Sequence, residues 1–111
     1  MKCFCEQKET YYLKVEGDGG ADPIWCYTCG CNLDFEEVPL SKELKDELMH
    51  WIMQYGEWID WDRDKLVPDG IELEEEHNRI GEELTEKVKE ELGEGYQVTF
   101  SPATMAKSYP R

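Results

Sequence analysis

The chain has 111 residues, of which 40% are hydrophobic and 34% charged, and its 26 acidic and 12 basic side chains give a formal net charge of −14. This length predicts one small domain, and the charge disfavours binding to nucleic-acid phosphates while favouring a basic protein partner. No apolar run approaches the roughly 18 residues that a membrane-spanning helix requires, so we expect a cytoplasmic protein without a membrane segment.

Two short strands are predicted in the first third of the chain. Residues 10–16 alternate between side chains of different polarity and are rich in β-forming types, which predicts a strand with Tyr11, Leu13 and Val15 on one face. A glycine-rich segment follows, and residues 24–27 resume an extended pattern. A further short strand is expected near residues 33–38, although three acidic side chains weaken its pattern.

Two amphipathic helices and a last strand are predicted in the remainder. Ser41 is expected to cap a first helix of about five turns that ends near residues 60–62, and a second helix is expected over residues 71–92. Residues 96–100 alternate as a final strand, and residues 103–111 are expected to be a loose tail. The apolar side chains of the first helix recur at helical spacing: Leu44, Leu48, Trp51, Ile52, Tyr55, Trp58 and Ile59.

All cysteines of the chain fall in its first 31 residues: Cys3, Cys5, Cys26, Cys29 and Cys31. Two closely spaced pairs are a pattern that brings four thiolates around one tetrahedral metal such as Zn²⁺. Gly30 follows the second pair, and a glycine tolerates the positive φ that a turn around a metal requires. Disulfides and a redox pair are the alternatives. The odd cysteine count, the absence of an apolar run after Met1 and the lack of a strand-to-helix context disfavour both.

This pattern resembles a zinc ribbon over residues 1–38, and it is carried by Cys3, Cys5, Cys26, Cys29 and Gly30. The resemblance implies a β-hairpin that holds one structural zinc ion. The chain departs from the usual pattern because its first pair is C-x-C and because Cys31 is a fifth thiol. The expected ligands are therefore Cys3, Cys5, Cys26 and Cys29, and the alternative is a set in which Cys31 replaces one of the N-terminal pair. A site of four cysteines also accepts iron.

These patterns together predict an α+β fold with an N-terminal zinc-ribbon-like β-hairpin, two amphipathic helices and a C-terminal β-strand. Residues 1–38 would form the hairpin, and residues 39–111 would form a helix-helix-strand part packed on it as one compact domain. The last strand is expected to pack on the helices and to pair with the hairpin.

The first helix is unusually rich in large aromatic side chains. Core packing explains most such residues, but Trp and Tyr also concentrate at binding hot spots. The alternative is therefore that a partner surface is formed by Trp51, Tyr55, Trp58 and Trp61. Of the two histidines, His50 is expected to face solvent, and His77 is expected to be a hydrogen-bonded core residue.

No catalytic Ser/His/Asp order, phosphate loop or carboxylate pair at diagnostic spacing stands out. We therefore hypothesise a non-enzymatic, acidic, zinc-containing protein-binding module, of the small bacterial type. An inhibitor or immunity-type protein that masks a basic surface of a nucleic-acid enzyme or toxin would have this character. The alternative hypothesis is a metal- or redox-responsive switch that uses Cys31 or the cysteine cluster. A hydrolase with an open zinc position is a third hypothesis.

Overall fold

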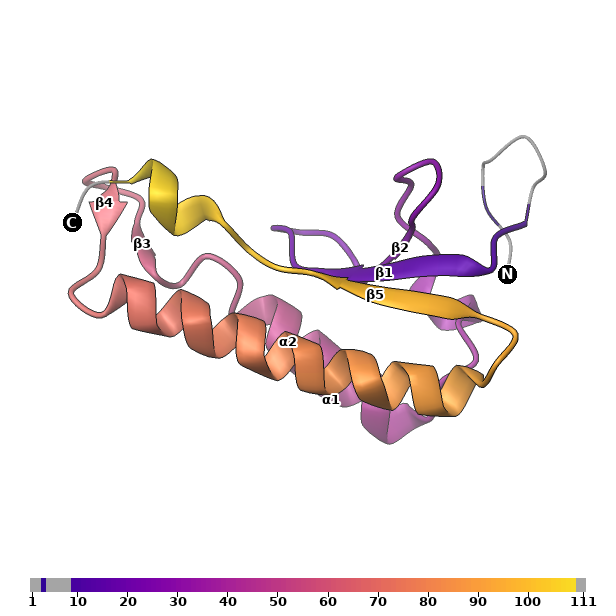
Figure 1. The fold of residues 1–111 in the computed structure, drawn as a ribbon. Coiled ribbons are helices and arrows are strands. Elements are labelled where there is room, and N and C mark those ends of the chain that lie inside the picture. Colours follow the sequence, from indigo (N-terminus) through magenta and orange to yellow (C-terminus); the bar gives the residue numbers. More distant parts are fainter. Residues whose placement is uncertain (1–2, 4–8, 110–111) are drawn as a thin grey trace.

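The computed structural model describes Cys3 and residues 9–109, and it confirms the predicted α+β fold. Figure 1 shows a sheet of three strands lying over two helices, with a smaller group of elements beyond one end of the sheet. In chain order the elements are β1 (Tyr12–Glu16), β2 (Ile24–Cys26), the 3-10 helix η1 (Phe35–Glu37), α1 (Lys42–Met53), β3 (Ile59–Asp60), β4 (Lys65–Leu66), α2 (Gly70–Leu92), β5 (Gln97–Ser101) and the 3-10 helix η2 (Met105–Ser108).

The first strand of the chain is the central strand of the sheet, whose order is β2-β1-β5. β1 pairs antiparallel with β2, with Leu13 opposite Cys26, and parallel with β5, with Leu13 opposite Val98. Parallel strands cannot be joined by a tight turn, so the chain crosses over between them, here through both α-helices. The expectation that the last strand pairs with the hairpin is therefore confirmed.

One face of the sheet packs on the helices. Leu13 and Val15 expose 0% of their surface, and each apolar side chain buried to this degree contributes about 1.5–3 kcal/mol. Tyr11 was expected on the same face but is 55% exposed, because β1 begins only at Tyr12. The larger core combines side chains from the predicted hairpin part, residues 1–38, with side chains from the part that follows it. Its buried members are Leu13, Val15, Ile24, Cys26, Leu33, Phe35, Val38, Leu44, Leu48, Trp51, Ile52, Leu84, Val88 and Val98.

α1 begins as predicted and ends earlier. The Ser41 side chain accepts a hydrogen bond from the Leu44 backbone N–H at 3.2 Å, which caps the first turn. The helix ends at Met53, because Gly56 adopts a φ of +86° and the chain reverses into the β3-β4 hairpin. Trp58 thus leaves the helix, although its position fits the helical spacing.

The hairpin and the C-terminal segment form a second, smaller core. Trp58, Ile59 and Leu66 are its buried members, and partly buried side chains from α2 and from residues 103–109 pack around them. The prediction of a loose tail is wrong for residues 103–109. The strand expected near residues 33–38 is also wrong, since Asp34 accepts a hydrogen bond from the Glu36 N–H and starts η1 instead.

Side chains of α2 hold the C-terminal segment in place. The Asn78 amide donates to the Ala103 carbonyl at 3.0 Å and accepts from the Ala103 N–H at 2.8 Å. The buried Glu74 carboxylate accepts from the Ala106 N–H at 2.8 Å. The backbone of this segment is therefore held by side chains of α2, and the sequence of the segment itself gives no sign of these hydrogen bonds.

α2 spans the length of the molecule and allows its neighbours to approach closely (Figure 1). A Cβ at Gly81 would lie 2.3 Å from the Phe100 ring and 2.9 Å from the Trp51 ring, so any larger residue would force these rings to move. None of the helices within residues 9–109 combines the length and the apolar character needed to cross a membrane.

Candidate functional site

Sulfur atoms gather at the end of the sheet where β2 turns back. The Cys3 Sγ lies 3.3 Å from the Cys29 Sγ and 3.2 Å from the Cys31 Sγ, and the Cys29 and Cys31 sulfurs are 3.2 Å apart. The sulfurs of Cys3, Cys26 and Cys29 all lie within 4.8 Å of one another. Cys5, the fourth predicted ligand, lies outside the described residues.

The turn that follows β2 positions these thiols. The Gly30 N–H donates to the Cys26 carbonyl at 2.9 Å, and the Cys26 N–H donates to the Cys31 carbonyl at 2.9 Å. Gly30 has a φ of +77°, which confirms the expected conformation. Behind the turn, the Cys26 thiol lies 3.3 Å from the Thr10 hydroxyl in the buried interior. The chain thus holds Cys26, Cys29 and Cys31 in one tight loop.

This arrangement is compatible with a zinc-ribbon-like knuckle. Four sulfurs at about 2.3 Å from a zinc ion lie about 3.8 Å from one another. The observed separations of 3.2–3.3 Å reach that spacing by movements of about half an ångström. The cluster therefore has the donor chemistry of a metal site, and the identity of the metal stays a prediction.

The four predicted partner-binding aromatic residues separate into two environments. Trp51 and Trp58 each expose 2% of their surface and belong to the two cores, so neither is an exposed side chain. Tyr55 is partly buried beside Trp58. Trp61 is 56% exposed and packs edge-on against Tyr109 at 5.9 Å, so among the four it alone is an exposed large side chain.

His77 lies between the two cores and packs against three aromatic rings. Its ring stacks on Trp51 at 4.5 Å and lies 4.9 Å from Trp58 and 5.8 Å from Tyr55. It is buried, as expected, but neither of its ring nitrogens has a hydrogen-bond partner among the described residues, so the predicted hydrogen bond is wrong. Burial lowers the pKa of His77 to about 4, so the ring is neutral at neutral pH. His50 is exposed, as expected.

α1 and α2 carry a large share of the acidic side chains of the chain. α1 and α2 together carry twelve acidic and five basic side chains, a net charge of −7, which is half of the total. A groove of about 310 Å³ lies between them. Its apolar lining comes from Trp51, Ile80 and Leu84, and its polar lining comes from Glu47, His50, Gln54, Glu83 and Lys87.

Both carboxylates of this groove form ion pairs with cations of α2. The Lys87 ammonium lies 2.9 Å from the Glu47 carboxylate, and Arg79 lies 2.7 Å from Glu83. Sequence patterns alone do not identify the groove, because Glu47 and Glu83 belong to different helices. The available signal was the regular recurrence of exposed acidic positions on both helices.

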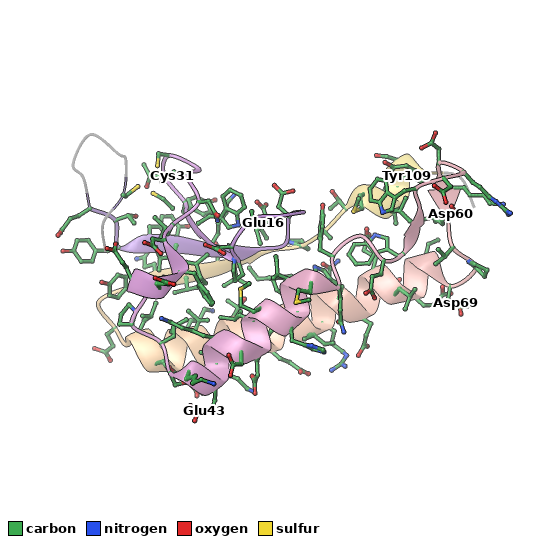
Figure 2. All side chains as sticks on the ribbon, turned by 180° about the vertical axis from the view of Figure 1, so that it is seen from behind. Glu16, Cys31, Glu43, Asp60, Asp69 and Tyr109 are labelled. Carbon is green, nitrogen blue, oxygen red and sulfur yellow. The ribbon has the colours of Figure 1, made fainter. Side chains whose placement is uncertain are left out.

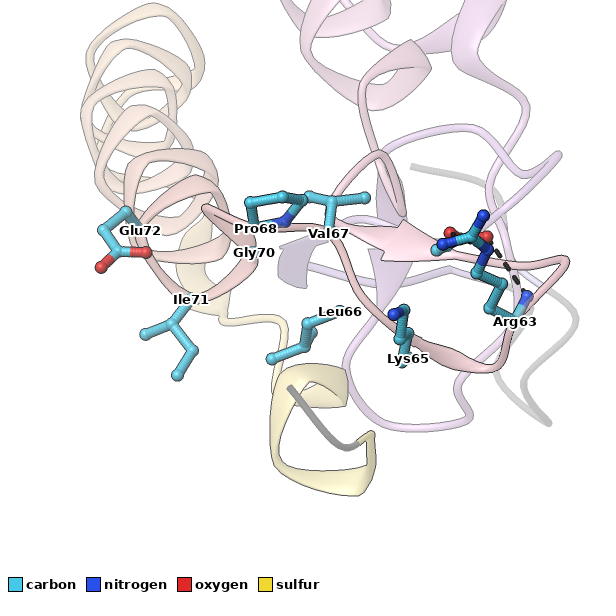
Figure 3. Close-up of a pocket in the computed structure, with 9 residues that line it drawn as sticks. Arg63, Lys65, Leu66, Val67, Pro68, Gly70, Ile71 and Glu72 are labelled. Atoms are coloured by element: carbon cyan, nitrogen blue, oxygen red, sulfur yellow. Dashed lines mark hydrogen bonds and ion pairs between the residues drawn. The ribbon is translucent and has the colours of Figure 1, made fainter.

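A second depression, of about 320 Å³, lies beside the β3-β4 hairpin and the start of α2. Figure 3 shows Arg63 and Lys65 at one end and Ile71 and Glu72 at the other, with Arg63 paired to Asp60 at 3.8 Å. Figure 2 places this end of the molecule opposite the cysteine cluster. The described lining contains no histidine, cysteine or serine, and we assign no chemistry to it.

A family model described as Serratia CdiI immunity protein-like matches residues 11–103. None of the curated proteins compared with the chain matches it. The family match spans both α-helices and every strand, but it leaves out Cys3 and Cys5.

Proposed function

The chain belongs to the Serratia CdiI immunity protein-like family, and from this premise we propose that it is a non-enzymatic protein that binds and neutralises a basic partner toxin. The match over residues 11–103 is the observation that carries the proposal. It does not favour the alternative of a metal- or redox-responsive switch centred on Cys31. The proposed compartment is the cytoplasm, where thiols stay reduced.

The charge distribution supports a basic partner. Eleven of the acidic side chains on α1 and α2 are exposed: Glu43, Asp46, Glu47, Glu72, Glu75, Glu76, Glu82, Glu83, Glu86, Glu90 and Glu91. The exposed cations on these helices are each paired with a carboxylate, as in the pair of Lys42 with Asp46 and that of Lys89 with Glu86. A surface of this kind attracts a cationic protein, speeds the encounter and repels phosphate backbones.

The groove between α1 and α2 is the proposed anchor point. Its apolar floor suits the methylene stem of an arginine or lysine side chain, and the carboxylates of Glu47 and Glu83 suit its charged end. Arginine is favoured, since its planar guanidinium can bridge two carboxylates. Trp61 is the remaining exposed aromatic of the predicted set, and we propose it as a second contact.

Growth protection tests the proposal directly. The full chain is co-expressed with candidate toxins from the organism that encodes it, and the cognate toxin is the one whose lethality the chain suppresses. Binding of that purified toxin is then measured at rising salt concentration. We expect the association rate to fall steeply with salt, because exposed charges are screened. Tight binding that is insensitive to salt would contradict the charge-driven mode.

Matched variants locate the contact. The double variant Glu47→Gln/Glu83→Gln removes both groove carboxylates, and Glu94→Gln removes one exposed carboxylate outside the helices as a control. We expect the double variant to weaken toxin binding by about tenfold or more, mainly through slower association, and the control to change it less than about twofold. Equal effects of the two variants would remove the groove from the interface. Trp61→Ala tests the second contact in the same assay.

A further inference from the structure

The geometry of the cysteine cluster points to a zinc site with a spare ligand. We propose that Cys3, Cys26 and Cys29 are fixed ligands of one zinc ion, and that Cys31 can complete the tetrahedron when Cys5 is absent. This inference does not rest on the proposed function, since Cys3 and Cys5 lie outside the family match.

The position of Cys31 carries the inference. Its sulfur is as close to those of Cys3 and Cys29 as they are to each other, at 3.2, 3.2 and 3.3 Å. Together these three form one triangular face, and Cys26 lies within 4.8 Å of both Cys3 and Cys29 on the buried side. The three sulfurs of this face require only small movements to lie at about 2.3 Å from one ion.

The surroundings favour a metal. The backbone of the turn is already closed by the Gly30 and Cys26 hydrogen bonds, so Cys29 and Cys31 are positioned before an ion arrives. Four thiols would release their protons as thiolates bind Zn²⁺, and no electron transfer is needed. A bound ion would tie the Cys3 end of the chain to the turn that follows β2, and it would close a loop of more than twenty residues.

The test compares full-length variants purified under reducing conditions without chelator. Zinc content is measured by elemental analysis, and affinity is measured by competition with a chromogenic chelator. Far-UV circular dichroism establishes that each variant is folded. We expect one zinc ion per chain in the unmodified protein and in Cys5→Ser, with affinities within about tenfold of each other. We expect at least a hundredfold loss of affinity in Cys26→Ser and in the double variant Cys5→Ser/Cys31→Ser.

Cobalt substitution supplies an independent readout, because the visible spectrum of Co²⁺ reports the number of thiolate ligands. Cys5→Ser should retain the spectrum of a four-thiolate site. Loss of zinc from Cys5→Ser would refute the spare-ligand role of Cys31. Retention of zinc in the double variant would show a three-thiolate site and overturn the tetrahedral assignment. Absence of metal from the unmodified chain, even after addition of zinc chloride, would refute the metal site as a whole.

Discussion

His77 makes the stability of this protein depend on pH. Its ordinary pKa of 6.5 falls to about 4 in the folded chain, because burial disfavours the charged ring. The folded state therefore binds a proton less readily than the unfolded state. The stabilising contribution of His77 is complete above its unfolded pKa and is lost as the pH falls through the interval from 6.5 towards 4.

The magnitude follows from the size of this interval. A difference of roughly 2.5 pKa units corresponds to a total of about 3 kcal/mol, and about 2 kcal/mol of it is lost by about pH 5. The surroundings offer no compensation, since both ring nitrogens lack a hydrogen-bond partner among the described residues and the ring packs against the uncharged rings of Trp51, Trp58 and Tyr55. The buried Glu74, one turn earlier on α2, is bonded to the Ala106 N–H.

Urea unfolding followed by tryptophan fluorescence measures this effect. The free energy of unfolding is determined between about pH 7.5 and about pH 5 for the unmodified chain, for His77→Leu and for His50→Gln. The readout is the difference between chains at each pH, because carboxylate titration is common to all of them. We expect His77→Leu to remove about 2 kcal/mol of the pH-dependent loss, and His50→Gln, at an exposed site, to leave it unchanged. Equal pH dependence in all three chains would exclude His77 as its source, as would a pKa near 6.5 for His77 measured by NMR.

Other contacts lead to further predictions. Gly81→Ala should destabilise the chain by about 1–2 kcal/mol in thermal unfolding, since the cost of overpacking exceeds the gain in helix propensity. Gly95 has open space around it, so Gly95→Ala should not destabilise the chain, and equal effects of the two substitutions would rule out the steric cause. Ser41→Ala should cost about 1 kcal/mol through loss of the α1 cap, and an unchanged melting temperature would contradict this role. Asn78→Ala should release the C-terminal segment and accelerate tryptic cleavage after the exposed Lys107. Unchanged digestion kinetics would show that Asn78 does not hold this segment.

Local sequence patterns predicted much of the fold because they report which side chains face the interior. The alternation around Leu13 and Val15 identified the central strand, and Ser41 identified the start of α1. The cysteine spacing predicted the sulfur cluster, since a short turn with a glycine at positive φ brings nearby thiols together whatever the rest of the fold.

Features that depend on contacts between distant segments could not be predicted in this way. Trp58 keeps helical spacing with α1, but the reversal at Gly56 sends it into the second core. Residues 103–109 look featureless because the groups that fix them, Asn78 and Glu74, lie on α2. His77 has no hydrogen-bond partner within the described part of the chain, because the rings packed against it come from other segments.

The central position of β1 imposes an order on folding. β2 follows β1 closely and can pair with it early, but Glu16 of β1 and Ser101 of β5, joined by a hydrogen bond of 2.6 Å, are 85 positions apart. Contacts of such separation form slowly, because the closure of a long loop precedes any gain from pairing. Until β5 is synthesised, β1 offers one open edge to neighbouring chains. During synthesis the interval before β5 emerges is therefore the period in which this protein is most exposed to self-association.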